Sequence, residues 1–129
     1  ISLHMPLLES TRHFVNAEII AKMKDGVTII NCARGELMNI PDMIRGIETQ
    51  KIGALALDVF DKEDGIYHEN RRDDIISNRD MAYLRQFPNV IMTQHMAFYT
   101  DAAVQSMVFC GIEGLCDFAK TGHTETELV

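Results

Sequence analysis

The sequence predicts an α/β fold built on a parallel sheet, and three features of the chain support this prediction. Short apolar runs of strand length alternate with segments of helical periodicity. The runs are continuously apolar, as in strands buried inside a parallel sheet. Glycine, asparagine and proline residues separate the two kinds of segment. Buried strands that alternate with helices favour one sheet with right-handed crossovers.

Four segments have the composition of buried strands. One of them, Val27–Asn31, is a β-branched run, and valine, threonine and isoleucine favour extended backbone. A proline directly after the first run ends that strand and leads into a loop. The four predicted strands are Ile1–Met5, Val27–Asn31, Gly53–Phe60 and Val90–Thr93.

Three short helices are expected between these strands, and a long loop precedes the third. Asn16 and Asn39 are candidate N-caps, because an asparagine side-chain oxygen accepts from free backbone N–H groups. Pro41 fits the first turn of the second helix, where its missing N–H costs nothing. The predicted helices are Ala17–Lys24, Ile40–Thr49 and Asp80–Gln86, and the loop is Asp61–Asn78.

The last segment predicts one long amphipathic helix. Its apolar residues recur at i, i+3 and i+4 from Val104 to Ala119. Thr100 is the expected N-cap, and Gly122 is the expected stop, because glycine takes the left-handed turn at a helix end. The one candidate boundary in the chain lies just before this helix, near residues 98–101.

Composition excludes several classes of protein. The chain has 129 residues and a net charge of −7, which suits one modest domain and argues against a nucleic-acid-binding surface. No apolar run approaches ~20 residues and no signal peptide is present, so we expect no membrane segment and a cytoplasmic location. The odd number of cysteines (Cys32, Cys110 and Cys116) indicates free thiols. The chain opens without Met in mid-pattern, and we interpret it as the interior of a longer protein.

Charged and titratable residues follow the predicted strands. Ligands of parallel α/β sheets bind beyond the carboxyl ends of the strands. Arg34 follows the second strand and His95 follows the fourth. Asp58 lies near the end of the third predicted strand, and Glu63 lies in the loop after it. We therefore expect these side chains to meet at one edge of the sheet.

These residue types suit the reduction of a 2-keto acid. Arg34 can hold a planar carboxylate through two hydrogen bonds. His95 can give or take a proton, and a neighbouring Glu63 would favour its charged form. Each residue also has a plainer interpretation. Arg34 can be a surface ion-pair partner, Glu63 a solvated charge and His95 a structural histidine.

No other motif predicts a site. No pair of cysteines or histidines has the spacing of zinc ligands, and the acidic run Asp61–Gly65 lacks the spacing of a calcium loop. No metal site is therefore expected. No Gly-x-Gly-x-x-Gly turn occurs among the eight glycines. The histidines His13, His68 and His123 show no pattern and are assigned no role.

Five motifs occur in order at and near the ends of the predicted strands: Ile1–Pro6, Met23–Gly26, Asn31–Leu37, Leu57–Phe60 and Thr93–His95. Together they resemble a known family, the D-isomer-specific 2-hydroxyacid dehydrogenases. The likeness extends from Ile1 to about Lys120. Within the family, Asp64–Tyr67 and His95–Thr100 look most like the fermentative D-lactate dehydrogenase branch, with 2-hydroxyisocaproate and 2-hydroxyglutarate dehydrogenases as close competitors.

The resemblance implies a division of the chain. Residues 1–98 would be the C-terminal half of a nucleotide-binding domain, that is, the second half of a Rossmann-like parallel sheet. Residues 99–129 would be a helix and tail that return to the substrate domain. The partners implied are a small 2-keto or 2-hydroxy acid, the missing N-terminal portion of the same protein and, in the complete enzyme, a second copy in a homodimer.

The resemblance also implies roles for individual residues. Arg34 would bind the substrate carboxylate, His95 would be the acid/base, and Glu63 would be its charge partner. Phe98 or Tyr99 would face the substrate side chain. The residues implied to approach the cofactor NAD are Met5, Pro6, Thr11, Cys32, Ala33 and Asp58. One departure is Gln94, which stands where the family usually has proline before the histidine.

The function implied is part of an NAD-dependent oxidoreductase that reduces a pyruvate-like 2-keto acid to the D-2-hydroxy acid. The isolated segment is expected to lack turnover, because it lacks a phosphate-binding turn. Two alternatives stay open. The chain can belong to an NAD-sensing co-regulator of the same family, or it can be an inactive structural fragment.

Overall fold

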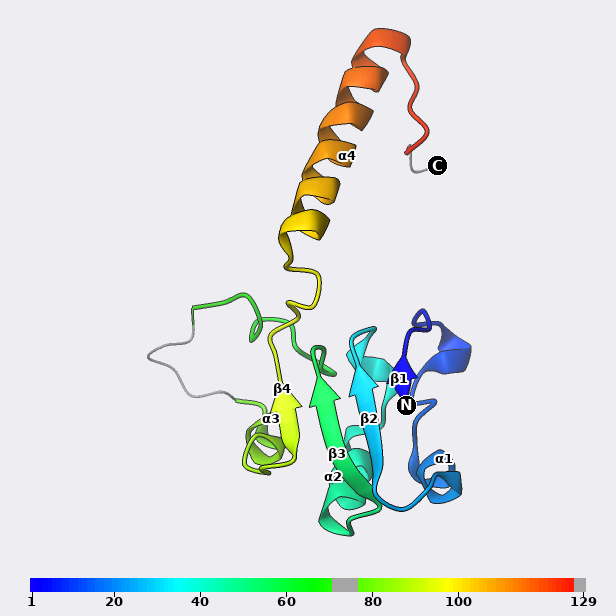
Figure 1. Cartoon of the computed structure of the whole chain (residues 1–129), viewed down its shortest axis with the longest axis vertical. Helices are drawn as coiled ribbons and strands as arrows, with labels where there is room; N and C mark the ends of the chain where they lie inside the picture. The colour runs from blue at the N-terminus through cyan, green and yellow to red at the C-terminus, as the bar shows by residue number, and fades with distance from the viewer. Residues whose placement is uncertain (71–76, 127–129) are drawn as a thin grey trace. The chain divides into compact units, whose positions relative to one another are not determined.

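A computed structural model of the chain describes residues 1–70 and 77–126. It contains a four-stranded, wholly parallel sheet, with the strands in sequential order (Figure 1). Leu3 lies opposite Asn31, and Asn31 lies opposite Leu57, so the first three strands end level with one another. The predicted parallel α/β fold is therefore confirmed. The strands are β1 (Ser2–Leu3), β2 (Val27–Asn31), β3 (Ile52–Leu57) and β4 (Val90–Met92).

In the part of the chain that the structure describes, four α-helices and two short 3-10 turns connect and follow these strands. The predicted caps are confirmed, because Asn16 accepts from two backbone N–H groups and Asn39 from one. A third asparagine, Asn78, caps the helix before β4 in the same way. The elements are η1 (Glu9–Thr11), α1 (Ala17–Lys22), η2 (Gly35–Leu37), α2 (Ile40–Glu48), α3 (Arg79–Leu84) and α4 (Asp101–Thr121).

Several elements end earlier than the sequence predicts. β1 has two residues, because His4 and Met5 extend past the residues that pair with β2. α1 stops at Lys22, since Met23 takes an extended backbone conformation. β3 ends at Leu57, which leaves the next residues free to form the loop that carries Glu63.

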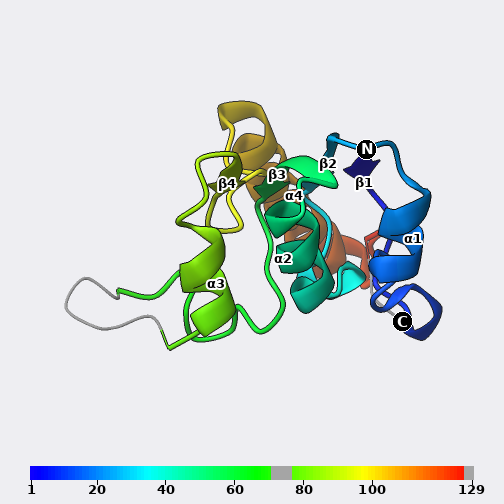
Figure 2. The same cartoon turned by 90° about the horizontal axis from the view of Figure 1, so that it is seen from below.

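The main core lies between the sheet and the helices of residues 1–96. When sequential parallel strands are joined by right-handed crossovers, all the connecting helices lie on one face of the sheet. Figure 2 shows α1, α2 and α3 on the same side of the strands. Side chains from the sheet and from α2 and α3 interlock there and are almost fully buried. They include Ile29, Leu55, Leu57, Met43, Ile47, Met81 and Leu84.

The opposite face of the sheet is open, which corrects the expectation of strands buried on both sides. Burial alternates along β2, and Ile30 is 38% exposed while its neighbour Ile29 is fully buried. On β4, Ile91 is 66% exposed. The apolar runs have the composition of strands covered on both faces, but among residues 1–70 and 77–96 the helices cover one face only.

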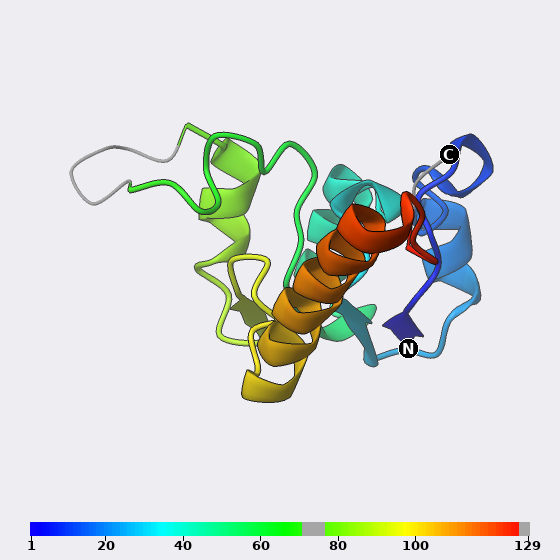
Figure 3. The same ribbon diagram turned by 90° about the horizontal axis from the view of Figure 1, so that it is seen from above.

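The chain separates into two compact units, Ile1–Met96 and Ala97–Val129. The second unit is dominated by α4, a single uninterrupted helix (Figure 3). Its predicted ends are confirmed, because Thr100 accepts from the Ala103 N–H and Gly122 closes the helix at φ 72°. None of its 21 residues is buried. The assignment of this unit to a substrate domain stays a prediction.

By length and composition, α4 is apolar enough to cross a membrane. We expected this helix from the sequence, but as an amphipathic helix and not as a candidate membrane segment. A single helix of this kind is weak evidence for a membrane span, because a core helix of a soluble protein passes the same test. Its exposed large side chains include Met107, Phe109, Ile112, Leu115 and Phe118.

Gly35 brings the loop after β2 against the loop after β3. A Cβ atom at this position would lie 2.1 Å from the carbonyl carbon of Phe60 and 2.4 Å from the amide nitrogen of Asp61. These are backbone atoms, so they cannot swing aside as the end of a flexible side chain would. Only glycine therefore permits this close approach of two loops at the carboxyl edge of the sheet.

We expect Gly35→Ala to lower the free energy of unfolding by about 3 kcal/mol, because overpacking against backbone forces the two loops apart. Urea unfolding followed by circular dichroism measures the change. Gly111→Ala is the matched control, since nothing lies within 4 Å of its added methyl group. Equal stability of the two variants would contradict the close approach.

Candidate active site

His95 and Glu63 form the best-defined pair of functional groups at the carboxyl edge of the sheet. Nδ1 of His95 lies 2.6 Å from Oε1 of Glu63. The other carboxylate oxygen, Oε2, accepts the backbone N–H of Phe60 at 2.7 Å. Both oxygens of Glu63 are therefore engaged. Because a carboxylate accepts, Nδ1 is the donor, and Nε2 of His95 is left to face a ligand.

A tight turn places Glu63 for this contact. Its carbonyl oxygen accepts from the N–H groups of Ile66 at 2.9 Å and Tyr67 at 3.0 Å. Tyr67 is buried and anchors the turn in the core. Burial, with the negative charges of Glu63 and Asp58 adding to it and Arg85 opposing it, raises the pKa of Tyr67 to about 12.

Asp58 holds the segment that carries His95. Its side chain is 4% exposed, and Oδ1 accepts from the hydroxyl of Thr93 at 2.5 Å and the N–H of Met96 at 2.8 Å. Its carbonyl oxygen accepts the N–H of His95 at 2.6 Å. These bonds stabilise His95 in a left-handed backbone conformation with φ 56°. The family resemblance implied a cofactor contact for Asp58, but the sequence did not predict its hydrogen bonds to the segment that carries His95.

Arg34 stands on a turn organised by Asn31. The buried side chain of Asn31 donates to the carbonyl of Arg34 at 2.8 Å and accepts from the N–H of Ala33 at 3.0 Å. The Arg34 side chain is exposed, and its Nη1 donates to the carbonyl of Ala33 at 2.7 Å. Sequence analysis gave Asn31 no role, although a polar residue at the end of an apolar strand was a usable signal.

A cavity of about 500 Å³ lies beside Arg34, at the carboxyl ends of β1 and β2. It brings together four residues singled out by sequence, Met5, Pro6, Ala33 and Arg34, and adds His4 and Leu7. The hydroxyl of Thr11 donates to the carbonyl of Pro6 at 2.9 Å and so fixes the loop below the cavity. Cys32 is an exposed free thiol in the neighbouring turn.

Phe98 and Tyr99 belong to the second unit, Ala97–Val129. Both are exposed, and their rings meet edge to face with centroids 6.1 Å apart. Their implied contact with a substrate side chain stays a prediction.

One residue near the pair was missed by the sequence analysis. The ring of His68 lies beside the ring of His95, with centroids 6.1 Å apart and an angle of 44° between the ring planes. His68 lies five residues after Glu63. Neither the periodicity of a helix nor that of a strand places residues with this spacing on the same side. Only the turn after Glu63 explains the proximity.

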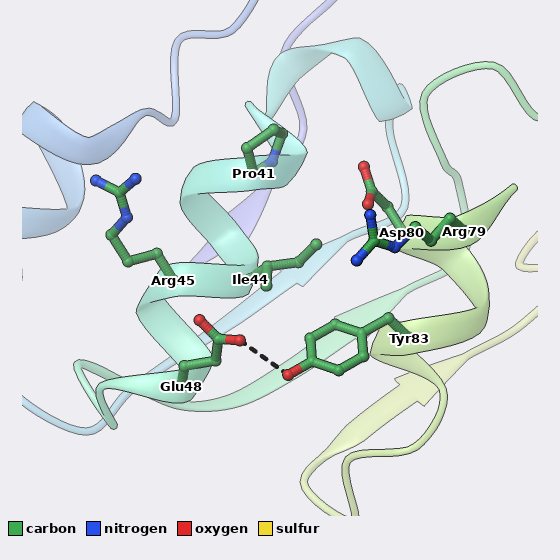
Figure 4. A pocket seen from close by; sticks show the side chains of 7 residues that line it. All are labelled: Pro41, Ile44, Arg45, Glu48, Arg79, Asp80 and Tyr83. Atoms are coloured by element: carbon green, nitrogen blue, oxygen red, sulfur yellow. Dashed lines mark hydrogen bonds between the residues drawn. The ribbon is translucent and has the colours of Figure 1, made fainter.

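A second hollow, of about 440 Å³, lies between α2 and α3, away from the strand ends (Figure 4). Ile44 and Tyr83 line it, and the Tyr83 hydroxyl donates to Oε1 of Glu48 at 2.8 Å. This hydrogen bond raises the pKa of Tyr83. None of the catalytic, substrate-binding or cofactor-binding residues predicted from the sequence lines the hollow.

Comparison with known proteins identifies the family. Residues 1–97 match the profile described as D-isomer specific 2-hydroxyacid dehydrogenase, NAD binding domain. The chain is 42% identical over 129 residues to an aromatic 2-oxoacid reductase of Clostridium sporogenes, covering 100% of this chain and 39% of that protein. It is 35% identical over 128 residues to a D-lactate dehydrogenase of Lactiplantibacillus plantarum, covering 99% and 39%.

Solved structures agree with this assignment. A D-lactate dehydrogenase from Sporolactobacillus superimposes with a TM-score of 0.94 at 31% identity, over 98% of this chain and 38% of that one. The NAD-complexed D-isomer specific 2-hydroxyacid dehydrogenase from Lactobacillus delbrueckii gives 0.90 at 29% identity, over 99% and 39%. The chain belongs to the D-isomer specific 2-hydroxyacid dehydrogenases and forms part of their NAD-binding domain. It spans about two-fifths of the length of the curated relatives it matches.

The buried phenol of Tyr67 predicts a loss of stability in alkali. The unfolded chain ionises this phenol near its ordinary pKa of 10.0, whereas the folded protein keeps it neutral up to about pH 12. Its contribution is therefore complete below pH 10 and is lost as the pH rises through about 12. Tyr67→Phe should remove about 1 kcal/mol of the loss between pH 9 and 11.

Urea unfolding of both proteins at pH 9 and pH 11 measures this difference. The measurement at pH 9 is the control, because the Tyr67 phenol of the wild-type protein is then largely neutral in both the folded and the unfolded state. An alkaline loss of the same size in the two proteins would show that Tyr67 ionises freely in the folded state.

Proposed function

We propose that the chain supplies the acid/base and cofactor-binding part of an oxidoreductase that reduces a 2-keto acid to the D-2-hydroxy acid. The observation that carries the proposal is the His95–Glu63 contact of 2.6 Å at the carboxyl edge of a parallel sheet. Membership of the family supports the same reaction class. The proposed enzyme is longer than this chain and includes the N-terminal portion that the family resemblance implies, because the chain covers 39% of the aromatic 2-oxoacid reductase.

The proposed chemistry assigns one task to each side chain. Arg34 pairs with the substrate carboxylate through two parallel hydrogen bonds and so orients the carbonyl group. His95 holds a proton on Nε2 and donates it to the carbonyl oxygen, while Glu63 stabilises the imidazolium through Nδ1. When bound, the reduced nicotinamide of NADH would supply the hydride and leave as NAD⁺.

The cavity beside Arg34 supports the proposed cofactor site. Met5 and Pro6 at the end of β1 would line the adenine side, and Ala33 in the turn after β2 would offer backbone to the nicotinamide side. These residues already face one hollow of about 500 Å³. The family resemblance assigns Thr11, Cys32 and Asp58 to the same cofactor.

The substrate is proposed as a small, pyruvate-like 2-keto acid, with Phe98 or Tyr99 toward its side chain. D-lactate dehydrogenases among the relatives favour this choice. The aromatic 2-oxoacid reductase, at 42% identity, favours a larger aromatic side chain as the second candidate. In the complete protein we place the enzyme in the cytoplasm as a homodimer, with α4 packed on the substrate domain.

Substitution of His95 tests the proposal in the polypeptide that includes the N-terminal portion. We expect His95→Gln to lower kcat about 10³-fold with little change in NADH affinity, because it removes the proton donor alone. Loss of NADH absorbance with pyruvate and with phenylpyruvate measures turnover, and NADH fluorescence measures cofactor binding.

Glu69→Gln is the matched control, an exposed side chain on the Glu63 loop. Arg34→Lys should raise KM for the keto acid more than it lowers kcat, since a lysine cannot form the two-pronged contact. Wild-type turnover by His95→Gln would refute the proposed acid/base role.

A further inference from the structure

His68 places a second imidazole ring beside that of His95. Its ring centroid lies 6.1 Å from that of His95, close enough for ring edges to touch, and the planes are tilted by 44°. His68 is exposed, whereas His95 is half-buried. The two rings come from loops 27 residues apart in the chain, so tertiary structure alone brings them together.

The backbone holds His68 in this position. Tyr67 is buried and its N–H is bonded to the carbonyl of Glu63, so the residue before His68 is anchored at both side chain and main chain. His68 itself has φ 61°, in the left-handed region that non-glycine residues seldom adopt. His95 is also left-handed, with φ 56°. Such conformations persist where the surroundings determine them, and they gather at functional sites.

The hydrogen bond to Glu63 does not by itself fix the plane of the His95 ring. Small coupled rotations about the two side-chain torsions of His95 can tilt the ring while Nδ1 stays within hydrogen-bond distance of Oε1, and such a tilt shifts Nε2 relative to a substrate oxygen. A neighbouring ring that contacts the imidazole from the side restricts this tilt. Proton transfer depends on such alignment, because small misplacements of a reacting atom lower the rate steeply.

We propose that His68 is a positioning residue that packs against the ring of His95 and fixes the direction of Nε2. The inference rests on the proposed function for its catalytic consequence. It adds a second constraint to the one that Glu63 supplies, and it acts through ring contact, without a bond to the substrate. A phenylalanine at position 68 can therefore replace the histidine, whereas an alanine cannot.

Turnover of three variants of the complete polypeptide tests the catalytic consequence. We expect His68→Ala to lower kcat roughly tenfold at nearly unchanged KM, because Arg34 still binds the carboxylate. His68→Phe should stay within about twofold of the wild type. Glu69→Ala, which removes an exposed neighbour on the same loop, is the control for loop damage.

NMR of the 129-residue chain tests the ring contact independently of activity. We expect a nuclear Overhauser effect between ring protons of His68 and His95, and a ring-current shift of the His95 protons that His68→Phe retains and His68→Ala removes. Glu69→Ala should leave both signals in place. Absence of these signals in the wild-type chain would overturn the inference even if the enzyme is active.

The remaining outcomes also decide the inference. If His95→Gln abolishes turnover and His68→Ala does not change it, the proposed function stands and the inference is overturned. If His68→Phe is as impaired as His68→Ala, a polar atom of His68 is required and ring packing is the wrong account. Retained activity in His68→Phe, lost activity in His68→Ala and the matching NMR signals together support the inference.

Discussion

The contact between Nδ1 of His95 and Oε1 of Glu63 is the interaction on which the site depends. It joins the loop after β3 to the segment after β4. Each partner is also held by hydrogen bonds of its own. The backbone N–H of Phe60 holds the other oxygen of Glu63, and Asp58 accepts from the backbone N–H groups of His95 and Met96. The pair is therefore preorganised by neighbouring backbone, which reduces the rearrangement required when a ligand binds.

The sheet supplies the common origin of these loops. β1, β2 and β3 end level with one another, so the residues that follow them start from one edge. Buried polar side chains then shape each exit. Asn31 forms the turn that presents Arg34, and Asp58 ties β3 to the segment of His95. Gly35 lets the second and third exits touch through their backbones.

Most of the fold could be predicted from local sequence, because strand runs and asparagine caps act over a few residues. Arg34, Glu63 and His95 could be singled out for the same reason, since each follows an apolar run. The open face of the sheet could not be foreseen, because an apolar strand does not say what covers it. His68 also escaped, since its approach to His95 depends on the buried Tyr67 and on a left-handed turn that no side-chain pattern encodes.

We propose that Arg34 and the His95–Glu63 pair, which lie on separate loops, together hold one small 2-keto acid. A crystal structure of the complete protein with NADH and oxamate, an unreactive mimic of a 2-keto acid, is the decisive test. We expect the oxamate carboxylate to pair with the Arg34 guanidinium and the adjacent carbonyl oxygen to lie within about 3 Å of Nε2 of His95. Oxamate bound away from these two side chains, or Arg34 turned from the His95 ring, would contradict it.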